Sequence, residues 1–263
     1  MGKIAVVTGA SSGIGRCTAE ALRDMGCVVY DLSRRDIPIK NVKHIKTDIT
    51  KQEDVTSAIK EIIANEGRID ILVNCAGFGI SGAVEFTTTE EAKSQFEVNF
   101  FGAVTVTRAV LPHMREQHSG RIVNISSVAA VAHIPFQTYY SASKAAIESY
   151  TCCLDNEVKA FGIRVTAVAP GDICTEFTGA RQKSFDGDDI YGGRISRSVA
   201  GMEKDEQKGM SPEVAGKYIA KVALKKSVKP VSAIGASYKF LSVLCKTFPC
   251  KFRNYVVGML YAK

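Results

Sequence analysis

An apolar strand that runs into a glycine-rich turn and then into a helix is the feature that most restricts the fold of this chain. Ile4–Thr8 is predicted as a buried strand and Arg16–Asp24 as a helix. Glycines in the turn let the backbone approach a pyrophosphate, and the helix offers free N–H groups and its positive dipole end to that anion. The GxxxGxG spacing therefore predicts a nucleotide-binding loop, formed by Gly9, Ser11, Ser12, Gly13, Ile14 and Gly15.

Strand and helix patterns alternate along the chain until about residue 170. Strands apolar on both faces and separated by helices indicate a parallel sheet that is covered on both sides. We expect one α/β domain over residues 1–263, a Rossmann-type doubly wound sheet, with an irregular insertion at 175–211. The region 174–215 is expected to cover the substrate. Further strands are predicted at 27–32, 44–47, 71–74, 122–126 and 164–169. Helices are predicted at 52–66, at 137–161 and at 89–117, the last as a short helix leading into a long one that Pro112 is expected to kink.

Cysteine usage and hydropathy place the chain among cytoplasmic globular proteins. The eight cysteines form no CxxC pair and have no histidine cluster beside them, so we expect small buried side chains in a reducing compartment and no metal site. The start of the chain leads directly into the first strand, which argues against a signal peptide. No apolar run reaches the length of a transmembrane helix.

The residues after the second predicted strand bear on the choice of cofactor. An acid about 20 residues past the loop would bind the ribose 2′-hydroxyl of NAD, but Ser33 is followed there by Arg34 and Arg35. Two guanidinium groups favour a 2′-phosphate, so NADP(H) is predicted over NAD(H). Asp31 keeps the alternative open, because it would bind the 2′-hydroxyl if the strand ended earlier.

A tyrosine and a lysine four residues apart mark the predicted reaction centre. Tyr140 and Lys144 share one helix face, and a nearby cation would lower the pKa of the phenol from about 10. A phenol with a lowered pKa can exchange a proton with a carbonyl oxygen as hydride is transferred. An ordinary surface pair is the alternative explanation for these two residues taken alone.

Two further polar residues fit the same chemistry. Ser127 ends a predicted strand, where its hydroxyl can hold the reacting oxygen beside the phenol or simply cap a turn. Asn99 is polar between apolar neighbours in a helix, so it either satisfies a backbone group or anchors a water chain for proton relay.

These segments, in this order and spacing, resemble the short-chain dehydrogenase/reductases from Lys3 to about Thr175. The resemblance implies the Rossmann-type fold and a catalytic tetrad of Asn99, Ser127, Tyr140 and Lys144, with Lys144 also holding the nicotinamide ribose. One departure concerns the cofactor: members that prefer NADP often carry Arg or Lys where this chain has Ser12, so the NADP prediction rests on Arg34, with help from Arg35. The resemblance also implies that Asp48 contacts the adenine side, Asn74 the cofactor ribose, and Ile173 and Thr175 the carboxamide. The remaining cofactor contacts expected are Ile49, Ala76, Gly77, Pro170 and Gly171.

The segment after Ser127 is the predicted substrate wall. Residues 128–136 are largely apolar, with no cationic cluster to bind a carboxylate or phosphate. This favours a bulky lipophilic ketone or alcohol, a steroid first, although the residues would also suit plain core packing. His133 is the one histidine considered for the pocket lining.

All of the excess positive charge lies in the C-terminal segment 217–263. It holds ten Lys/Arg and no acid, whereas residues 1–216 carry 24 basic and 27 acidic groups. From Tyr238 onward, aromatic and aliphatic residues alternate with basic ones. A lid over the substrate or a subunit contact is ranked first, a membrane surface second, and nucleic acid is not expected.

The sequence predicts an NADP(H)-dependent oxidoreductase that interconverts a ketone and a secondary alcohol, similar to carbonyl reductases and hydroxysteroid dehydrogenases. A 3-oxoacyl-thioester reductase and a retinol or long-chain carbonyl reductase are alternatives, and a silent NADP-binding sensor or scaffold is an alternative of another class. A homodimer or homotetramer is expected, with the helices at 89–117 and 137–161 as packing surfaces.

Overall fold

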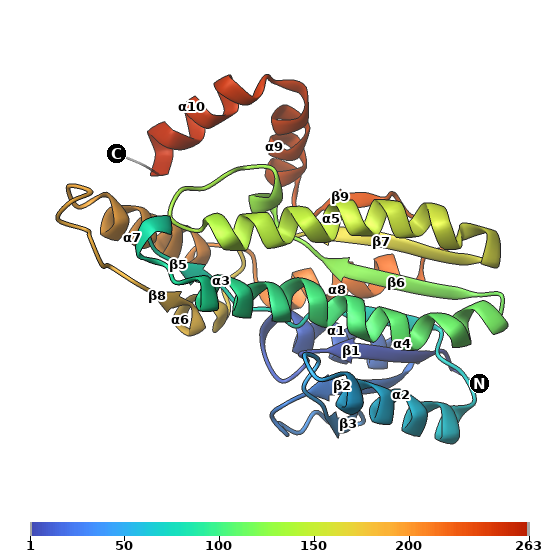
Figure 1. Ribbon diagram of the computed structural model, residues 1–263. Coiled ribbons are helices and arrows are strands. Elements are labelled where there is room, and N and C mark those ends of the chain that lie inside the picture. The colour runs from blue at the N-terminus through green and yellow to red at the C-terminus, as the bar shows by residue number, and fades with distance from the viewer. Residues whose placement is uncertain (1, 262–263) are drawn as a thin grey trace.

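The computed structural model describes residues 2–261, apart from the side chains of residues 246 and 260, and its centre is a seven-stranded parallel sheet (Figure 1). The strand order is β3-β2-β1-β4-β6-β7-β9. This confirms the predicted doubly wound α/β fold in a single domain. The strands of the sheet are β1 (Ile4–Thr8), β2 (Val28–Ser33), β3 (Lys43–Lys46), β4 (Ile71–Asn74), β6 (Gly120–Ile125), β7 (Ile163–Ala169) and β9 (Val231–Ala233).

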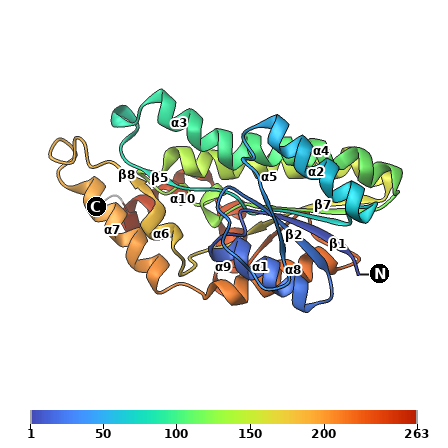
Figure 2. The ribbon, with the colours of Figure 1, turned by 90° about the horizontal axis from the view of Figure 1, so that it is seen from below.

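Helices cover both faces of the sheet, as Figures 1 and 2 show. Alternate side chains of β1 enter two different cores: Ala5 and Val7 lie in one, and Ile4 and Val6 in the other. Burial on both faces is why the central strands β1 and β4 are largely apolar, whereas the edge strand β3 is partly exposed and mostly polar. Helices α1 (Gly13–Asp24) and α8 (Pro212–Leu224) form the first layer, and α2 (Gln52–Glu66), α4 (Ala103–Glu116) and α5 (Thr138–Val158) form the second.

The chain reverses its direction across the sheet between β1 and β4, which lie side by side. Ligands of such folds bind outside the carboxyl ends of the strands at this switch point. The loops that leave the two strands are tied together, because Thr8 Oγ1 accepts hydrogen bonds at 3.1 Å from the amides of both Cys75 and Ala76.

The predicted helix at 89–117 is divided into three parts. A capping box of Thr88 and Glu91 begins α3 (Thr89–Phe96), a π-helical turn follows at Glu97–Gly102, and α4 continues through Pro112. The departure from α-helical geometry is therefore not at the proline, because the π-helical turn ends at Gly102, ten residues before Pro112. Single π turns of this kind often accompany functional sites.

The insertion at 175–211 is not irregular, and this prediction was wrong. It contains α6 (Phe177–Ala180), the short strand β8 (Gln182–Lys183), which pairs with β5 (Ile80–Ser81), and α7 (Arg194–Gln207) (Figure 2). Helix α7 buries only a narrow apolar stripe that includes Ile195, Val199 and Met202, which its many charged neighbours concealed in the sequence.

The rest of the chain after β7 is also regular. Helix α8 and strand β9, neither of which was predicted, complete the sheet, and two helices follow, α9 (Ala236–Thr247) and α10 (Cys250–Tyr261). Leu260 and Lys263, which belong to the predicted basic and apolar segment, lie outside the described side chains. The short 3-10 turns are Val84–Phe86, Val128–Ala130 and Lys159–Phe161.

The eight cysteines form no disulfide within the described residues, but the expectation that they are buried holds only for Cys27 and Cys245, since three others are half-buried and three are exposed. Cys153, Cys174 and Cys250 are exposed, because they occupy solvent-facing positions rather than the cores. Within residues 2–261, every helix is too short or too polar to pass through a lipid bilayer.

Candidate active site

A cavity of about 1280 Å³ opens at the carboxyl ends of the strands. It extends from the glycine-rich loop, past the end of β2, to Tyr140 and on to the C-terminal helices. The structure therefore gathers most of the predicted site residues around one space. Those that line it are Gly9, Ser11, Ser12, Gly13, Ile14, Gly15, Arg34, Arg35, Asp48, Ile49, Ala76, Gly77, Ser127, Tyr140, Lys144, Pro170, Gly171, Ile173 and Thr175.

The glycine-rich loop is packed too closely for side chains at two positions. Gly9 has φ +69°, and a Cβ there would lie 2.8 Å from Ala76 Cα, while a Cβ on Gly15 would lie 2.3 Å from the Gly9 carbonyl oxygen. Ser12 precedes α1 but makes no side-chain cap hydrogen bond. The first amides of α1 thus face the cavity without a side-chain cap, as an anion site requires.

The carboxylate of Asp31 is buried and already bonded on both oxygens. One oxygen accepts from the Ala10 amide at 3.0 Å, and the other accepts from Ser33 Oγ at 2.7 Å and lies 2.9 Å from His44 Nδ1. Asp31 therefore supports the loop from behind. His44, which looked incidental in the sequence, is part of this support.

Arg35 lies on the cavity side of the same strand end. Its Nη2 donates to Ser11 Oγ and Ser12 Oγ, both at 3.1 Å. The guanidinium thus stands beside Ser12, the position where the sequence lacks a basic residue. The glycine-rich loop has no basic residue at Ser12, and the fold brings the positive charge of Arg35, from the segment after β2, to this position.

Asp48 follows β3, and its carboxylate is close enough to Arg34 to be affected by the positive charge of that side chain. Burial works against its charge, but hydrogen bonds from the Thr50 side chain and amide, with Arg34 and Lys51 nearby, hold the pKa of the Asp48 carboxyl below its ordinary value. Arg34 and Asp48 thus lie together on the adenine side of the cavity predicted from the sequence.

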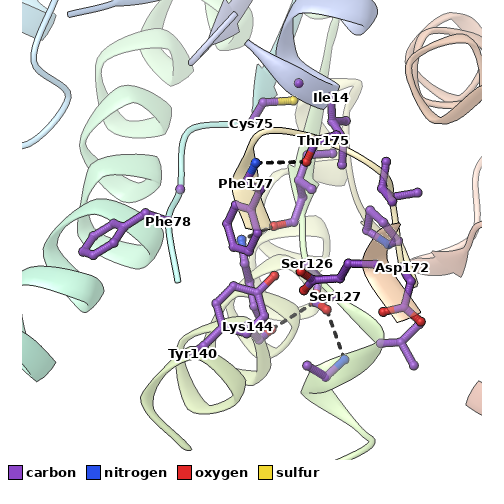
Figure 3. Close-up of a pocket in the computed structure, with 18 of the residues that line it drawn as sticks. Ile14, Cys75, Phe78, Ser126, Ser127, Tyr140, Lys144, Asp172, Thr175 and Phe177 are labelled. Carbon is purple, nitrogen blue, oxygen red and sulfur yellow. Dashed lines mark hydrogen bonds between the residues drawn. The ribbon is translucent and has the colours of Figure 1, made fainter. Parts of the chain in front are cut away.

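Tyr140 and Lys144 lie one turn apart on α5, at the reaction end of the cavity (Figure 3). The Lys144 ammonium is buried, donates to the Ile125 carbonyl at 2.9 Å, and lies 5.7 Å from the centre of the Tyr140 ring. Burial lowers the pKa of Lys144 to about 8. The pair is therefore no ordinary surface contact.

The pKa of Tyr140 is raised in this structure, and the expectation that it would fall was wrong. Burial is the largest cause and disfavours the phenolate; a hydrogen bond with Ser127 and the charge of Arg181 lower the pKa, and Glu206 and Asp172 raise it. The sequence argument considered one lysine and did not include the desolvation of the ring. In this state the phenol keeps its proton, as a proton donor must.

Ser127 stands at the end of β6, next to Tyr140 (Figure 3). Its hydroxyl accepts a hydrogen bond from the Ala129 amide at 3.1 Å, so it caps the 3-10 turn Val128–Ala130 while facing the cavity. Both roles considered from the sequence, capping a turn and lining the site, are thus compatible with its position.

Asn99 lies behind the cavity, inside the π-helical turn. Its side chain is buried and forms paired hydrogen bonds at 3.0 Å with the amide and the carbonyl of Phe78, and it also donates to Ser143 Oγ at 3.2 Å. A Cβ on Gly77 would lie 3.1 Å from Asn99 Oδ1 and 3.6 Å from Lys144 Nζ. The glycine thus leaves room for the two polar groups to approach each other.

Asn74 also lies away from the cavity. Its side-chain amide donates to Asn124 Oδ1 at 2.8 Å and to Thr107 Oγ1 at 3.2 Å, between β4, β6 and α4. The structure therefore places this side chain in the interior rather than with the other predicted cofactor contacts.

The predicted substrate wall contributes Val128, Ala129, Ala132 and Ile134 to the cavity. His133 does not line it: the imidazole is exposed, with Nδ1 3.3 Å from Asn254 Oδ1 of α10. The wall is therefore apolar, and the suggestion that His133 lines it was wrong.

A charged group that sequence reasoning missed lies behind Phe177. Arg181 is almost fully buried, forms an ion pair with Glu206, and lies 5.6 Å from the Phe177 ring centre, which is 5.8 Å from the Tyr140 ring. Glu206 also accepts from Thr178 Oγ1 at 2.7 Å. These residues come from the insertion, where no periodic pattern drew attention to them.

Asp172 is a second residue that sequence reasoning missed, and its hydrogen-bond partner is a tyrosine. Its carboxylate lines the cavity and accepts one hydrogen bond, from Tyr238 Oη at 2.6 Å. Burial and the nearby Glu206 and Asp205 raise the pKa of the Asp172 carboxyl, which Tyr238 and Arg181 only partly offset. In the view of Figure 3, Ser127 lies between Tyr140 and Asp172.

The two C-terminal helices close the far side of the cavity. Tyr238 of α9 packs directly on Gly171, and Tyr261 of α10 donates to Asp205 at 3.0 Å. The side chains of this segment that line the cavity are Tyr238, Leu241, Leu244, Cys245, Phe248, Phe252, Arg253, Val256, Val257 and Tyr261.

Comparison with known proteins agrees with this arrangement. The sequence model of the short chain dehydrogenase family matches residues 3–185. A 3-ketodihydrosphingosine reductase of Bacteroides thetaiotaomicron is 39% identical over 99% of this chain and 98% of its own, and a probable short-chain type dehydrogenase/reductase of Helicobacter pylori is 30% identical over 97% and 98%. A solved short-chain dehydrogenase from Streptomyces avermitilis is 33% identical, with a TM-score of 0.83 over 92% of this chain and 91% of that one.

The cofactor class follows from the family, but the individual cofactor does not. Similar folds have been solved with NADH and with NADP bound, so likeness of fold does not choose between them. The nucleotide loop, the reaction-end residues and these matches lead to one conclusion: the chain belongs to the short-chain dehydrogenase family and is an oxidoreductase that uses a nicotinamide cofactor.

Proposed function

We propose that this enzyme uses NADPH to reduce the ketone of a long-chain lipid that carries an ammonium group near the carbonyl, as 3-ketodihydrosphingosine does. The observation that carries the proposal is the composition of one cavity. Its reaction end holds Tyr140, Ser127 and Lys144, its side holds the carboxylate of Asp172, and its far wall is the apolar face of α9 and α10. The relative with 39% identity, whose name includes this ketone, points the same way.

The cofactor half of the cavity suits NADP. Asp31 would select NAD only if its carboxylate reached a ribose hydroxyl in the cavity, but this carboxylate is buried, does not line the cavity and already accepts hydrogen bonds from protein donors on both oxygens. Arg35 stands beside Ser11 and Ser12 instead, where a 2′-phosphate would gain two charge-assisted hydrogen bonds from a guanidinium. The closely packed glycines and the free amides of α1 fit the pyrophosphate.

NADPH supplies the hydride for such a reduction. Tyr140, whose phenol keeps its proton, donates that proton to the oxygen of the substrate carbonyl. The Ser127 hydroxyl donates a hydrogen bond to the same oxygen and holds it beside the phenol. The buried Lys144 ammonium stabilises the phenolate that remains.

Asn99 acts in this proposal as a positioning residue. Its hydrogen bonds to both backbone groups of Phe78 and to Ser143 fix the segment after β4 against α5, the helix that carries Tyr140 and Lys144. Gly77 lies between Asn99 and Lys144, because a Cβ there would be 3.1 Å from Asn99 Oδ1 and 3.6 Å from Lys144 Nζ, so a side chain at this position would disturb both groups.

The apolar lining alone would serve a steroid as well as a long chain. Asp172 favours the long-chain amino ketone over the steroid ketone. A carboxylate in a largely apolar wall is costly to bury unless it meets a cation, and a steroid ketone has no cationic group. A long-chain amino ketone would place its ammonium at Asp172 and its chain along Leu241, Phe248 and Val256. The regions 174–215 and 217–263 then both cover the substrate.

Initial rates with the purified enzyme test the proposal. NADPH oxidation would be followed with 3-ketodihydrosphingosine, the same ketone without the amino group, a steroid ketone and a 3-oxoacyl thioester, and then repeated with NADH. We expect the highest kcat/KM for the amino ketone with NADPH. Preference for the steroid or the thioester would overturn the substrate, and faster turnover with NADH would overturn the cofactor.

Tight NADPH binding without turnover of any carbonyl would instead favour a sensor. The test therefore also addresses the alternative class, because binding is measured separately by the change in NADPH fluorescence.

A further inference from the structure

The C-terminal helices α9 and α10 carry apolar side chains on two faces, and only one of them faces the cavity. In Figure 1 the two helices stand apart from the layered body, above α5 and the segment that leads into it. The side chains that do not line the cavity include Phe240, Val243, Tyr255 and Met259, which are 66%, 62%, 66% and 43% exposed. A helix that only closed a pocket would present polar groups on this outer face.

The segment 248–252, which comprises the turn after α9 and the start of α10, joins the outer surface to the cavity. Phe248 and Phe252 form an aromatic pair with ring centres 5.0 Å apart. Both rings line the cavity, and both are also substantially exposed, at 44% and 51%. The apolar wall of the cavity is thus continuous with the exterior at this segment.

The positive charge of α9 and α10 restricts which kinds of partner can bind their outer face. No acidic residue follows Glu213 in the sequence, and Lys239 and Lys251 are both exposed. Lys239 precedes Phe240 in α9, and its Nζ lies 5.6 Å from the centre of the Tyr218 ring of α8. A second copy of the same surface would bring positive charges against positive charges. An anionic phospholipid surface would satisfy both the apolar and the basic groups.

We propose that α9 and α10, with the segment 248–252 where they meet, bind the surface of an anionic phospholipid bilayer, with Phe240, Val243, Phe248 and Phe252 in the headgroup region. The cavity then opens toward the lipid phase at Phe248 and Phe252, so that a lipophilic substrate enters without crossing water. The predicted subunit contact through α4 and α5 involves other surfaces and stays a prediction.

Vesicle sedimentation with the full-length enzyme tests the proposal. Sucrose-loaded vesicles of phosphatidylglycerol and phosphatidylcholine would be compared with vesicles of phosphatidylcholine alone, without substrate. We expect clear preference for the anionic vesicles, weakened by salt. The double variant K239Q/K251Q should lower the partition coefficient about 30-fold, since each basic residue near such a surface contributes about a factor of five.

Two further variants separate the surface from net charge and from folding. K60Q/K226Q removes two exposed lysines elsewhere and should leave the partition coefficient within about twofold. F240S/Y255S alters exposed side chains that do not line the cavity, so vesicle binding should fall while turnover of a short water-soluble ketone stays unchanged.

Equal binding to both vesicle types, or none, would overturn the proposal. So would sedimentation-velocity data in which F240S/Y255S converts a dimer into a monomer, because the outer face would then be a subunit contact. The binding readout needs no substrate, so its result is independent of whether the proposed reaction is correct.

Discussion

The Asp31 carboxylate accepts a hydrogen bond at 3.0 Å from the Ala10 amide and so joins the end of β2 to the nucleotide loop. The residue that kept NAD open as a cofactor in the sequence is thus committed to holding the loop. Its other oxygen meets Ser33 and His44, which leaves the space in front of the strand to the arginines.

Replacing Asp31 with Asn should therefore lower the free energy of unfolding and have little effect on the choice between NADPH and NADH. One donor to the carboxylate would lose its acceptor, which costs about 1–3 kcal/mol in the free energy of unfolding. Urea unfolding checks this, with the exposed Asp36→Asn as the control. A selective loss of NADH turnover with unchanged stability would instead show that Asp31 binds the ribose.

Replacing Arg35 with Ala should raise the KM for NADPH roughly 10- to 150-fold, because a charge-assisted contact contributes about 1.5–3 kcal/mol. The KM for NADH should barely change, since NADH has no 2′-phosphate. Steady-state kinetics with both cofactors measure the difference, and Lys60→Ala on α2 controls for the loss of one exposed positive charge. Equal losses with both cofactors would contradict the role assigned to Arg35.

Tyr140→Phe should lower kcat by about 10²–10⁴-fold, the usual contribution of general acid catalysis, while NADPH still binds. Tyr139→Phe is a matched control, because the neighbouring ring does not line the cavity. Single-turnover rates and a fluorescence titration of NADPH separate chemistry from binding. Full activity in Tyr140→Phe would refute the proposed mechanism.

The pH dependence of reduction should reflect Lys144. Burial lowers its pKa to about 8, so the ammonium is charged below this pH and loses its proton above it. The kcat/KM for ketone reduction should therefore hold below about pH 8 and decline above it, as the phenolate loses its stabilising charge. Lys144→Arg keeps its charge and should move the decline to higher pH; a profile unchanged in this variant would assign the titration to another group.

Asp172→Asn should raise the KM for the amino ketone roughly tenfold or more, because a charged partner for the ammonium is lost. The same ketone without the amino group should bind equally well to both enzymes. The exposed Asp189→Asn controls for the change in net charge. Parallel losses for both substrates would mean that Asp172 serves the fold, through Tyr238, rather than the substrate.

Local patterns were enough to predict six of the seven strands of the sheet and many of the residues that line the cavity. Burial on both faces makes the central strands largely apolar, and a side chain at Gly15 would place its Cβ only 2.3 Å from the Gly9 carbonyl oxygen. Both constraints act on residues that are close in the sequence, so both can be recognised there. Helix α7 and strand β9 were missed, because a narrow apolar stripe among charged residues and a three-residue strand carry little periodic signal.

By itself, the sequence determined the fold, the family resemblance and which residues gather at the reaction centre. Only the tertiary structure decided the hydrogen-bond partner of each charged side chain. Asp31 accepts from the Ala10 amide, and Arg35 donates to Ser12. Asp172 accepts from Tyr238, 66 residues away in the sequence. It also decided that the pKa of Tyr140 rises, because desolvation depends on everything packed around the ring and not on the lysine four residues along. Side-chain partners and burial are set by long-range packing, which periodicity does not record.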